Sequence, residues 1–278
     1  MLSLGVGLYI WGIPLASSAL MEITPRSVDA RIGEEVLASL DGHFLQPSTL
    51  GQAEQSQLTT SLSDVLSASA DSTPVKWKLV FRHSEFGPNA FALPDGTIVM
   101  TDEMVQLVGH DQQVLLGILA HEFGHVQYRH ALRMLYQTTA MGLLASVVWG
   151  DFNSLLAIAP AALGQASYSR AAEHEADAKS VQLLNAAHIS PAVMVTLFKK
   201  LDDWRRKQTE KVAKSKSAET KTIEPIDGSR TADNSKTKQP TDAADKDKPD
   251  QSWLGIAFAS HPADADRVAF FEEAARQH

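Results

Sequence analysis

The segment LAHEFGHVQYRH, residues 119–130, contains the residues whose types and spacing could do chemistry. His121 and His125 stand at positions i and i+4, so in a helix their imidazoles lie one turn apart on one face. The apolar residues before them recur at the same helical spacing, which points this face into the core. Two imidazoles at this spacing can bind one metal ion, and zinc accepts imidazole well. Glu122 completes the pattern H-E-x-x-H, in which the glutamate acts on a water held by the metal.

A catalytic zinc ion needs a third protein ligand and one open position. The segment SRAAEHEAD, residues 169–177, offers the best candidate. Glu173 and Asp177 share a helix face, and we expect Glu173 to be the third ligand. We expect Asp177 to accept the outer N–H of His121 or His125, which would hold that ring in one tautomer.

Two alternatives remain for this second segment. It could be a surface helix rich in charged residues, with Arg170 paired with Glu173. His174 and Glu175 are rival ligands, although they point elsewhere if Glu173 faces the first helix. Small residues in the same segment would let the two helices approach closely; these are Ala171, Ala172 and Ala176.

Helices and a few strands must position these residues. A long helix over 111–136, with Asp111 as its N-cap, is expected to carry the H-E-x-x-H pattern. The alternation in 75–81 predicts a strand, and 89–101 predicts two short strands joined by a Pro-Asp-Gly turn. Further helices are expected at 26–45, 50–69, 165–187, 191–207 and after residue 262.

Three stretches differ from the rest of the chain in composition. Residues 1–21 carry no charged side chain, which favours a membrane anchor over a signal peptide or a buried segment. The apolar region 138–164 is interrupted by polar residues and a proline, which favours a buried helical hairpin over one that dips into a bilayer surface. Residues 207–251 are polar and charged, and are expected to be a disordered insertion.

The overall composition excludes several classes of site. The chain has 278 residues, of which 44% are apolar and 21% charged, a normal globular balance. It contains no cysteine, which excludes disulfides, thiolate zinc sites and a cysteine nucleophile. The net charge is −8 and no basic stripe is present, so nucleic acid is not an expected partner.

Four ordered motifs give the chain a resemblance to a known family. They are HEFGHVQYRH, SRAAEHEAD, the NAFALPDG strand before them, and SHP with Arg267 after them. The chain resembles the membrane-associated zinc metallopeptidases of the CAAX prenyl protease, HtpX and BepA type. This resemblance implies an α+β, mainly helical, zincin-like fold with a small β-sheet next to the H-E-x-x-H helix. The segments it implies are a membrane anchor (1–21), an N-terminal helical segment (22–72), a metallopeptidase domain (73–206), the disordered polar insertion (207–251) and the C-terminal part of the domain (252–278).

The resemblance also assigns expected roles to single residues. His121, His125 and Glu173 would bind one Zn²⁺ per chain, and Glu122 would be the catalytic base. Asp177 corresponds to the aspartate of the family motif. Asn89 and Ala90 begin a strand whose free edge would bind an extended substrate.

His261 and Arg267 are candidates to stabilise the oxyanion of the transition state. His261 has a second option, because it could occupy the open zinc position until substrate arrives, and it could also merely cap the last helix. The remaining histidines have no cluster around them and are expected to be structural or to lie at the surface, with His130 in a local network with Arg129.

The expected activity is a zinc metalloendopeptidase that hydrolyses unfolded or misassembled polypeptides in membrane and envelope quality control. By resemblance, the domain would be membrane-anchored and periplasmic. The alternative is a chaperone or assembly factor that holds clients in the same cleft with little proteolysis.

Overall fold

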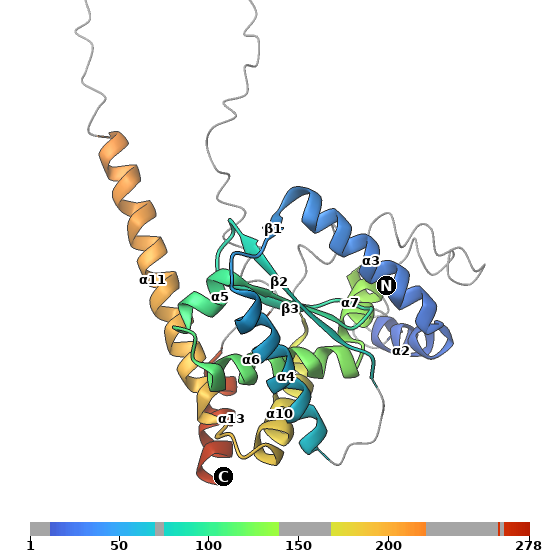
Figure 1. Cartoon of the computed structure of the whole chain (residues 1–278). Coiled ribbons are helices and arrows are strands. Elements are labelled where there is room, and N and C mark those ends of the chain that lie inside the picture. The colour runs from blue at the N-terminus through green and yellow to red at the C-terminus, as the bar shows by residue number, and fades with distance from the viewer. Residues whose placement is uncertain (1–11, 70–74, 139–167, 221–260, 262–263) are drawn as a thin grey trace, which may run out of the picture.

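The computed structural model describes residues 12–69, 75–138, 168–220, 261 and 264–278. Helices surround a small four-stranded sheet (Figure 1). The helices are α2 (Ile13–Ile23), α3 (Arg26–His43), α4 (Gln52–Ala68), α5 (Asp102–Leu107), α6 (Gln112–Gln127), α7 (His130–Thr138), α10 (Arg170–Ala186), α11 (Ala192–Thr220) and α13 (Ala265–Arg276). The strands are β1 (Leu45–Pro47), β2 (Lys78–Ser84), β3 (Ala90–Ala92) and β4 (Thr97–Thr101).

The sheet has the strand order β1-β2-β4-β3, so β3 lies at one edge. β2 and β4 run parallel, whereas β1 and β3 are antiparallel to their neighbours. The predicted Pro-Asp-Gly turn joins β3 to β4. Asp95 accepts hydrogen bonds there from the backbone N–H and the hydroxyl of Thr97. Gly96 adopts φ +88°, a left-handed conformation that glycine adopts without strain.

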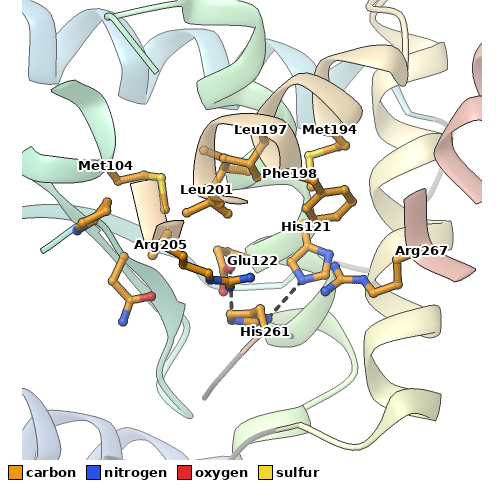
Figure 2. Close-up of a pocket in the computed structure, with 14 residues that line it drawn as sticks. Met104, His121, Glu122, Met194, Leu197, Phe198, Leu201, Arg205, His261 and Arg267 are labelled. Carbon is orange, nitrogen blue, oxygen red and sulfur yellow. Dashed lines mark hydrogen bonds and ion pairs between the residues drawn. The ribbon is translucent and has the colours of Figure 1, made fainter. Parts of the chain in front are cut away.

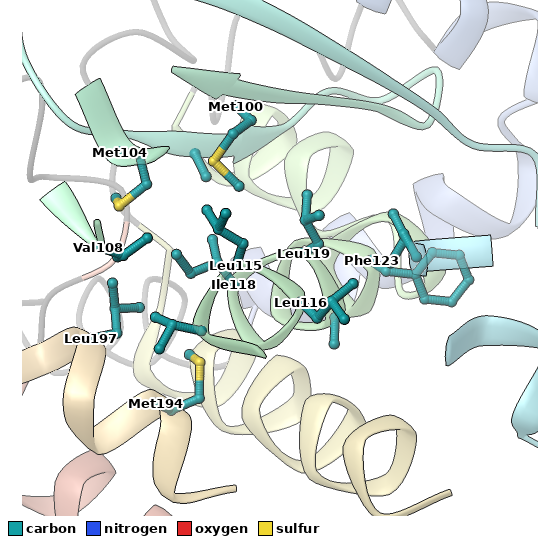
Figure 3. Packing of buried hydrophobic residues seen from close by; sticks show 14 of the residues in the cluster. Met100, Met104, Val108, Leu115, Leu116, Ile118, Leu119, Phe123, Met194 and Leu197 are labelled. Atoms are coloured by element: carbon teal, nitrogen blue, oxygen red, sulfur yellow. The ribbon is translucent and has the colours of Figure 1, made fainter. Parts of the chain in front are cut away.

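Both faces of the sheet are covered, and alternate residues of β4 supply both cores. Ile98 and Met100 pack with α6, α10 and α11 on one face, where Phe271 from α13 joins the same cluster (Figure 3). Val99 points to the other face and packs with residues of α2, α3 and α7. Figure 3 shows Met100 above α6, with Met194 of α11 on the opposite side of that helix. α6 is therefore buried on nearly all sides, from Val114 to Val126.

The prediction of one helix over 111–136 is wrong, although Asp111 does cap its start by accepting from the N–H groups of Gln113 and Val114. α6 ends at Gln127, and α7 begins at His130. Arg129 between them has φ +54°, which breaks the helical path. Tertiary contacts hold this turn in place, because the Arg129 guanidinium donates to both carboxylate oxygens of Asp29.

Other element boundaries also differ from those expected. β2 begins at Lys78 instead of residue 75. β1 was not predicted, because a strand of three residues is too short to show an alternation of apolar and polar residues. α11 continues past residue 207 to Thr220, so the start of the segment expected to be disordered is helical. Its lysines, glutamates and alanines are good helix formers, which favours this continuation.

The apolar region 138–164 lies outside the described residues except at its first residue, as does the first half of 1–21. Among the described residues, no helix combines the length and apolar character needed to cross a membrane.

Candidate metal centre

α6 presents the H-E-x-x-H residues to the interior of the protein. As whole residues, His121, Glu122 and His125 are all at least 97% buried. The Nε2 atoms of His121 and His125 lie 3.1 Å apart, so both rings turn the same nitrogen to a common point. The spacing of one helical turn therefore brings the two imidazoles together as expected.

α10 brings Glu173 to the same point. Ser169 caps this helix by accepting from the N–H of Ala172, so Glu173 lies in its first turn. Glu173 Oε2 lies 3.6 Å from His121 Nε2, and Glu173 Oε1 lies 3.5 Å from His125 Nε2. The two helices pack closely enough for this because Gly124 has no side chain where it meets Ala176. Ala172 is buried as well, whereas Ala171 is exposed.

His261 completes a group of four side chains. Its Nδ1 lies 3.2 Å from His121 Nε2 and 3.0 Å from Glu173 Oε1. Its Nε2 lies 3.4 Å from Glu122 Oε1. Figure 2 shows the ring beside Glu122 and His121. His261 is therefore in the group itself and does not act as the cap of α13, which is Asp264.

The geometry of this group fits a tetrahedral metal ion. Ligands about 2.0–2.1 Å from zinc are about 3.3 Å from one another in a tetrahedron. The separations among the four side chains, from 3.0 to 3.6 Å, scatter around that value. Two imidazoles and a carboxylate are a typical donor set for catalytic zinc. Glu122 Oε2 is buried without a hydrogen-bond partner among the described residues, as expected of an oxygen that faces a water or substrate.

Asp177 and Arg267 contact members of the group on the side away from the point where His121, His125 and Glu173 meet. Asp177 Oδ1 lies 2.8 Å from His121 Nδ1. The partner of Asp177, expected to be either His121 or His125, is therefore His121. The Arg267 guanidinium donates to both oxygens of Asp177 at 2.7 Å, and its Nη1 lies 2.6 Å from Glu173 Oε2. Burial would raise the pKa of Asp177, but the contacts with His121 and Arg267 outweigh it and lower that pKa to about 2.

His130 and Tyr168 also belong to the site, and the sequence analysis missed them. His130 Nδ1 lies 2.9 Å from His125 Nδ1, and its Nε2 lies 2.8 Å from Glu175 Oε2. The Tyr168 ring stacks on His125, with centroids 3.9 Å apart and an angle of 22° between the planes. In a helix that continued through residue 130, His125 and His130 would not lie on one face, so their contact was not expected. Tyr168 is brought to the site only by the fold.

The rival ligands on α10 turn away from the group. His174 is exposed and packs edge-on against the Phe270 ring. Glu175 faces His130 and Arg133. Glu173 is thus the carboxylate that α10 directs to the two histidines.

Burial dominates the electrostatics of the reactive side chains. It is the largest effect on Glu122 and raises the pKa of this carboxyl above its ordinary value. Burial is also the largest effect on His125 and lowers its pKa well below the ordinary value, which keeps the ring neutral as a metal ligand requires. Glu173 would have a raised pKa from burial alone, but the neighbouring His261, His121 and Arg267 lower it overall.

A cavity of about 50 Å³ opens beside the group. His121, Glu122 and His261 form one side, and Asn89 and Ala90 also line it. Figure 2 shows the opposite side, which is formed by apolar residues with Arg205 between the two sides. These apolar residues are Met104, Met194, Leu197, Phe198 and Leu201, whereas Ile118, which also lines the cavity, lies on α6 one turn before His121 and Glu122.

Strand β3 runs along the same cavity. Among the described residues no strand pairs with its outer edge. Asn89 O and Leu93 N bond to β4, so by the alternation of an antiparallel pair the backbone groups of Ala90 and Ala92 face outward. Tyr168 donates its hydroxyl to Ala92 O at 3.5 Å on that side.

Comparison with known proteins agrees with this arrangement. The model of peptidase family M48 matches residues 52–275. The chain belongs to peptidase family M48. The family resemblance and the mainly helical α+β fold expected from the sequence are therefore confirmed.

Several curated proteins are similar over part of the chain. Metalloprotease LoiP of Escherichia coli is 27% identical over 156 residues, which cover 54% of this chain and 60% of LoiP. The beta-barrel assembly-enhancing protease of Yersinia pestis is 29% identical over 168 residues, 54% of this chain and 33% of that protein. Mitochondrial metalloendopeptidase OMA1 of Saccharomyces cerevisiae is 24% identical over 135 residues, 48% of this chain and 39% of OMA1. The chain thus matches less than two thirds of the length of each of these relatives.

Proposed function

We propose that this protein is a zinc-dependent metalloendopeptidase. The observation that carries the proposal is the convergence of His121, His125 and Glu173 on one point, with the buried carboxylate of Glu122 beside it. Relatives named as metalloproteases support the same activity. His121 Nε2, His125 Nε2 and a Glu173 oxygen would hold one Zn²⁺ per chain.

Each residue of the site would have a separate role in peptide hydrolysis. Zinc, when bound, supplies a Lewis acid that polarises the scissile carbonyl and makes water more acidic. Glu122 takes a proton from the attacking water and passes it to the leaving nitrogen, and burial suits it to this role because a raised pKa makes it a stronger base. Asp177 keeps His121 oriented through its Nδ1, and Arg267 balances the charge of the two α10 carboxylates.

His261 would control access to the site. Of its two active roles, the distances favour occupation of the fourth ligand position, because Nδ1 faces His121 and Glu173. Residue 261 would then leave when substrate enters. Arg267 is fully engaged with Asp177 and Glu173, which favours a positioning role over direct contact with the oxyanion.

The substrate would be an extended polypeptide segment. The outward backbone groups of Ala90 can pair with such a segment whatever its sequence, as an unfolded protein requires, whereas Ala92 O already accepts from the Tyr168 hydroxyl. One side chain of the substrate would enter the apolar side of the cavity, against Leu197 and Leu201 of α11.

The cellular role is proposed by similarity. Four relatives are named for enhancing β-barrel assembly. A corresponding role here would be quality control of envelope proteins, with the domain in the periplasm and residues 1–21 attached to the membrane. A chaperone that holds clients without cleaving them is the alternative from the sequence, and no observation favours it.

The test combines metal analysis with the substitution Glu122→Gln. The purified wild-type protein is expected to contain one zinc per chain and to cleave an unfolded protein such as casein. Glu122→Gln is expected to retain the zinc and to lower kcat about 10²–10⁴-fold, because only the general base is lost. Glu35→Gln, an exposed glutamate on α3, is the control and should retain full activity. Absence of zinc from the wild type, or unchanged turnover in Glu122→Gln, would refute the proposal.

A further inference from the structure

His125 and His130 face each other through the same ring atom. Their Nδ1 atoms lie 2.9 Å apart, and both side chains are 99% buried. One of the two nitrogens must carry the proton and the other must accept it, since two bare lone pairs at this distance would repel. The second nitrogen of His130, Nε2, lies 2.8 Å from Glu175 Oε2.

The metal-binding role of His125 determines which nitrogen carries the proton. Its Nε2 faces His121 and Glu173, so this atom donates its lone pair to the ion. A neutral ring then has its hydrogen on Nδ1 and donates it to Nδ1 of His130. His130 consequently carries its own hydrogen on Nε2 and donates it to the Glu175 carboxylate. Every donor in this chain of contacts thus meets an acceptor.

We propose that His130 and Glu175 are positioning residues for the metal ligand His125. The proposal rests on the proposed metal centre and extends it. His121 reaches its carboxylate, Asp177, directly, whereas His125 reaches Glu175 through a second imidazole. This intermediate ring takes the place of the carboxylate or carbonyl that usually accepts the outer N–H of a metal-binding histidine.

The backbone at the end of α6 makes this contact possible. Arg129 adopts φ +54°, which ends the helical path before His130. Its guanidinium is held by Asp29 and by the carbonyl oxygens of Met21 and Thr24, so contacts with α2 and α3 stabilise the conformation. Arg133, one turn further along α7, also donates to Glu175 Oε2 at 3.3 Å.

Zinc affinity, measured by competition with a chromophoric chelator, tests the proposal without relying on activity. His130→Phe keeps a ring but removes the acceptor, and should weaken zinc binding about 10–100-fold. His130→Asn can still accept from His125 through its amide oxygen, and should bind zinc within a few-fold of wild type. Glu175→Ala should weaken zinc binding less than His130→Phe but more than His130→Asn. Glu175→Gln should weaken it less than Glu175→Ala.

A matched control uses another histidine–glutamate pair. His83 Nδ1 on β2 lies 2.6 Å from Glu103 Oε1 on α5, and His83→Phe should leave zinc affinity unchanged. Thermal unfolding of each metal-free variant shows whether it is folded. Nitrogen-15 NMR of the zinc-loaded wild type should show His130 as the neutral Nε2–H tautomer.

The outcomes separate the two proposals. Wild-type protein that binds no zinc would refute the proposed function. If the wild type binds zinc, two results would refute only the positioning role. One is a folded His130→Phe variant with the zinc affinity of the wild type, and the other is His130 carrying its proton on Nδ1.

Discussion

Gly124 on α6 and Ala176 on α10 meet so closely that a Cβ atom added to Gly124 would lie 2.9 Å from Ala176 Cα and 3.2 Å from its Cβ. This contact lies between the helix that carries His121 and His125 and the helix that carries Glu173. The distance between the proposed ligands on the two helices therefore depends on the absence of one side chain.

Gly124→Ala should weaken zinc binding and destabilise the fold by about 1–3 kcal/mol, because the added methyl group pushes α10 away from α6. The same substitution in an unhindered helix normally stabilises it. Gly51→Ala, at the extended N-cap of α4, is the control for an added methyl group without a clash, since a Cβ there has no neighbour within 4 Å. Chelator competition and urea unfolding measure the two effects. Unchanged zinc affinity in Gly124→Ala would show that the helix spacing does not control the site.

His261→Ala should raise the rate of peptide cleavage several-fold while zinc stays bound, if His261 occupies the fourth ligand position as its distances indicate. A donor to the transition state would behave in the opposite way, with kcat reduced about 10²–10³-fold. Initial rates on a fluorogenic peptide distinguish the two roles. His174→Ala, an exposed histidine on α10, serves as the control.

Leu201→Trp should fill the apolar side of the cavity. Peptides with leucine at the position whose side chain enters the cavity should show a higher KM. The KM of peptides with alanine at that position should change little. Zinc content should stay at the wild-type value, because Leu201 lies on the side of the cavity opposite the histidines (Figure 2). Equal losses on both peptides would place the substrate side chain elsewhere.

Asp177 should make stability depend on pH in the acid range. Its pKa of about 2 lies below the ordinary 3.8, so the carboxylate stabilises the fold above about pH 4, and this contribution is lost as pH falls towards 2. A shift of this size corresponds to about 2 kcal/mol. Urea unfolding of metal-free protein at pH 7 and pH 3 should show a smaller pH effect in Asp177→Asn than in wild type. Equal pH effects in both proteins would contradict the assignment.

The local chemistry of the site could be predicted from the sequence alone. Spacing of four residues on a helix places His121 with His125, and Glu173 with Asp177, because helical geometry is set by the backbone. The pairing of the two helices could be expected from the motif family and from the small residues on α10. The sequence likewise indicated the turn between β3 and β4, because proline, aspartate and glycine each favour a particular backbone conformation.

Only the tertiary structure decided how distant side chains join that local pattern. The motifs made His261 a candidate with several possible roles, but no periodicity places it 3.2 Å from His121 across 140 residues of chain. His130 faces His125 only because Asp29 and two backbone carbonyls hold Arg129 in a left-handed turn that helix propensity does not predict. Local spacing follows from the geometry of one helix, whereas the partners of its inward face depend on contacts that form when the whole core packs.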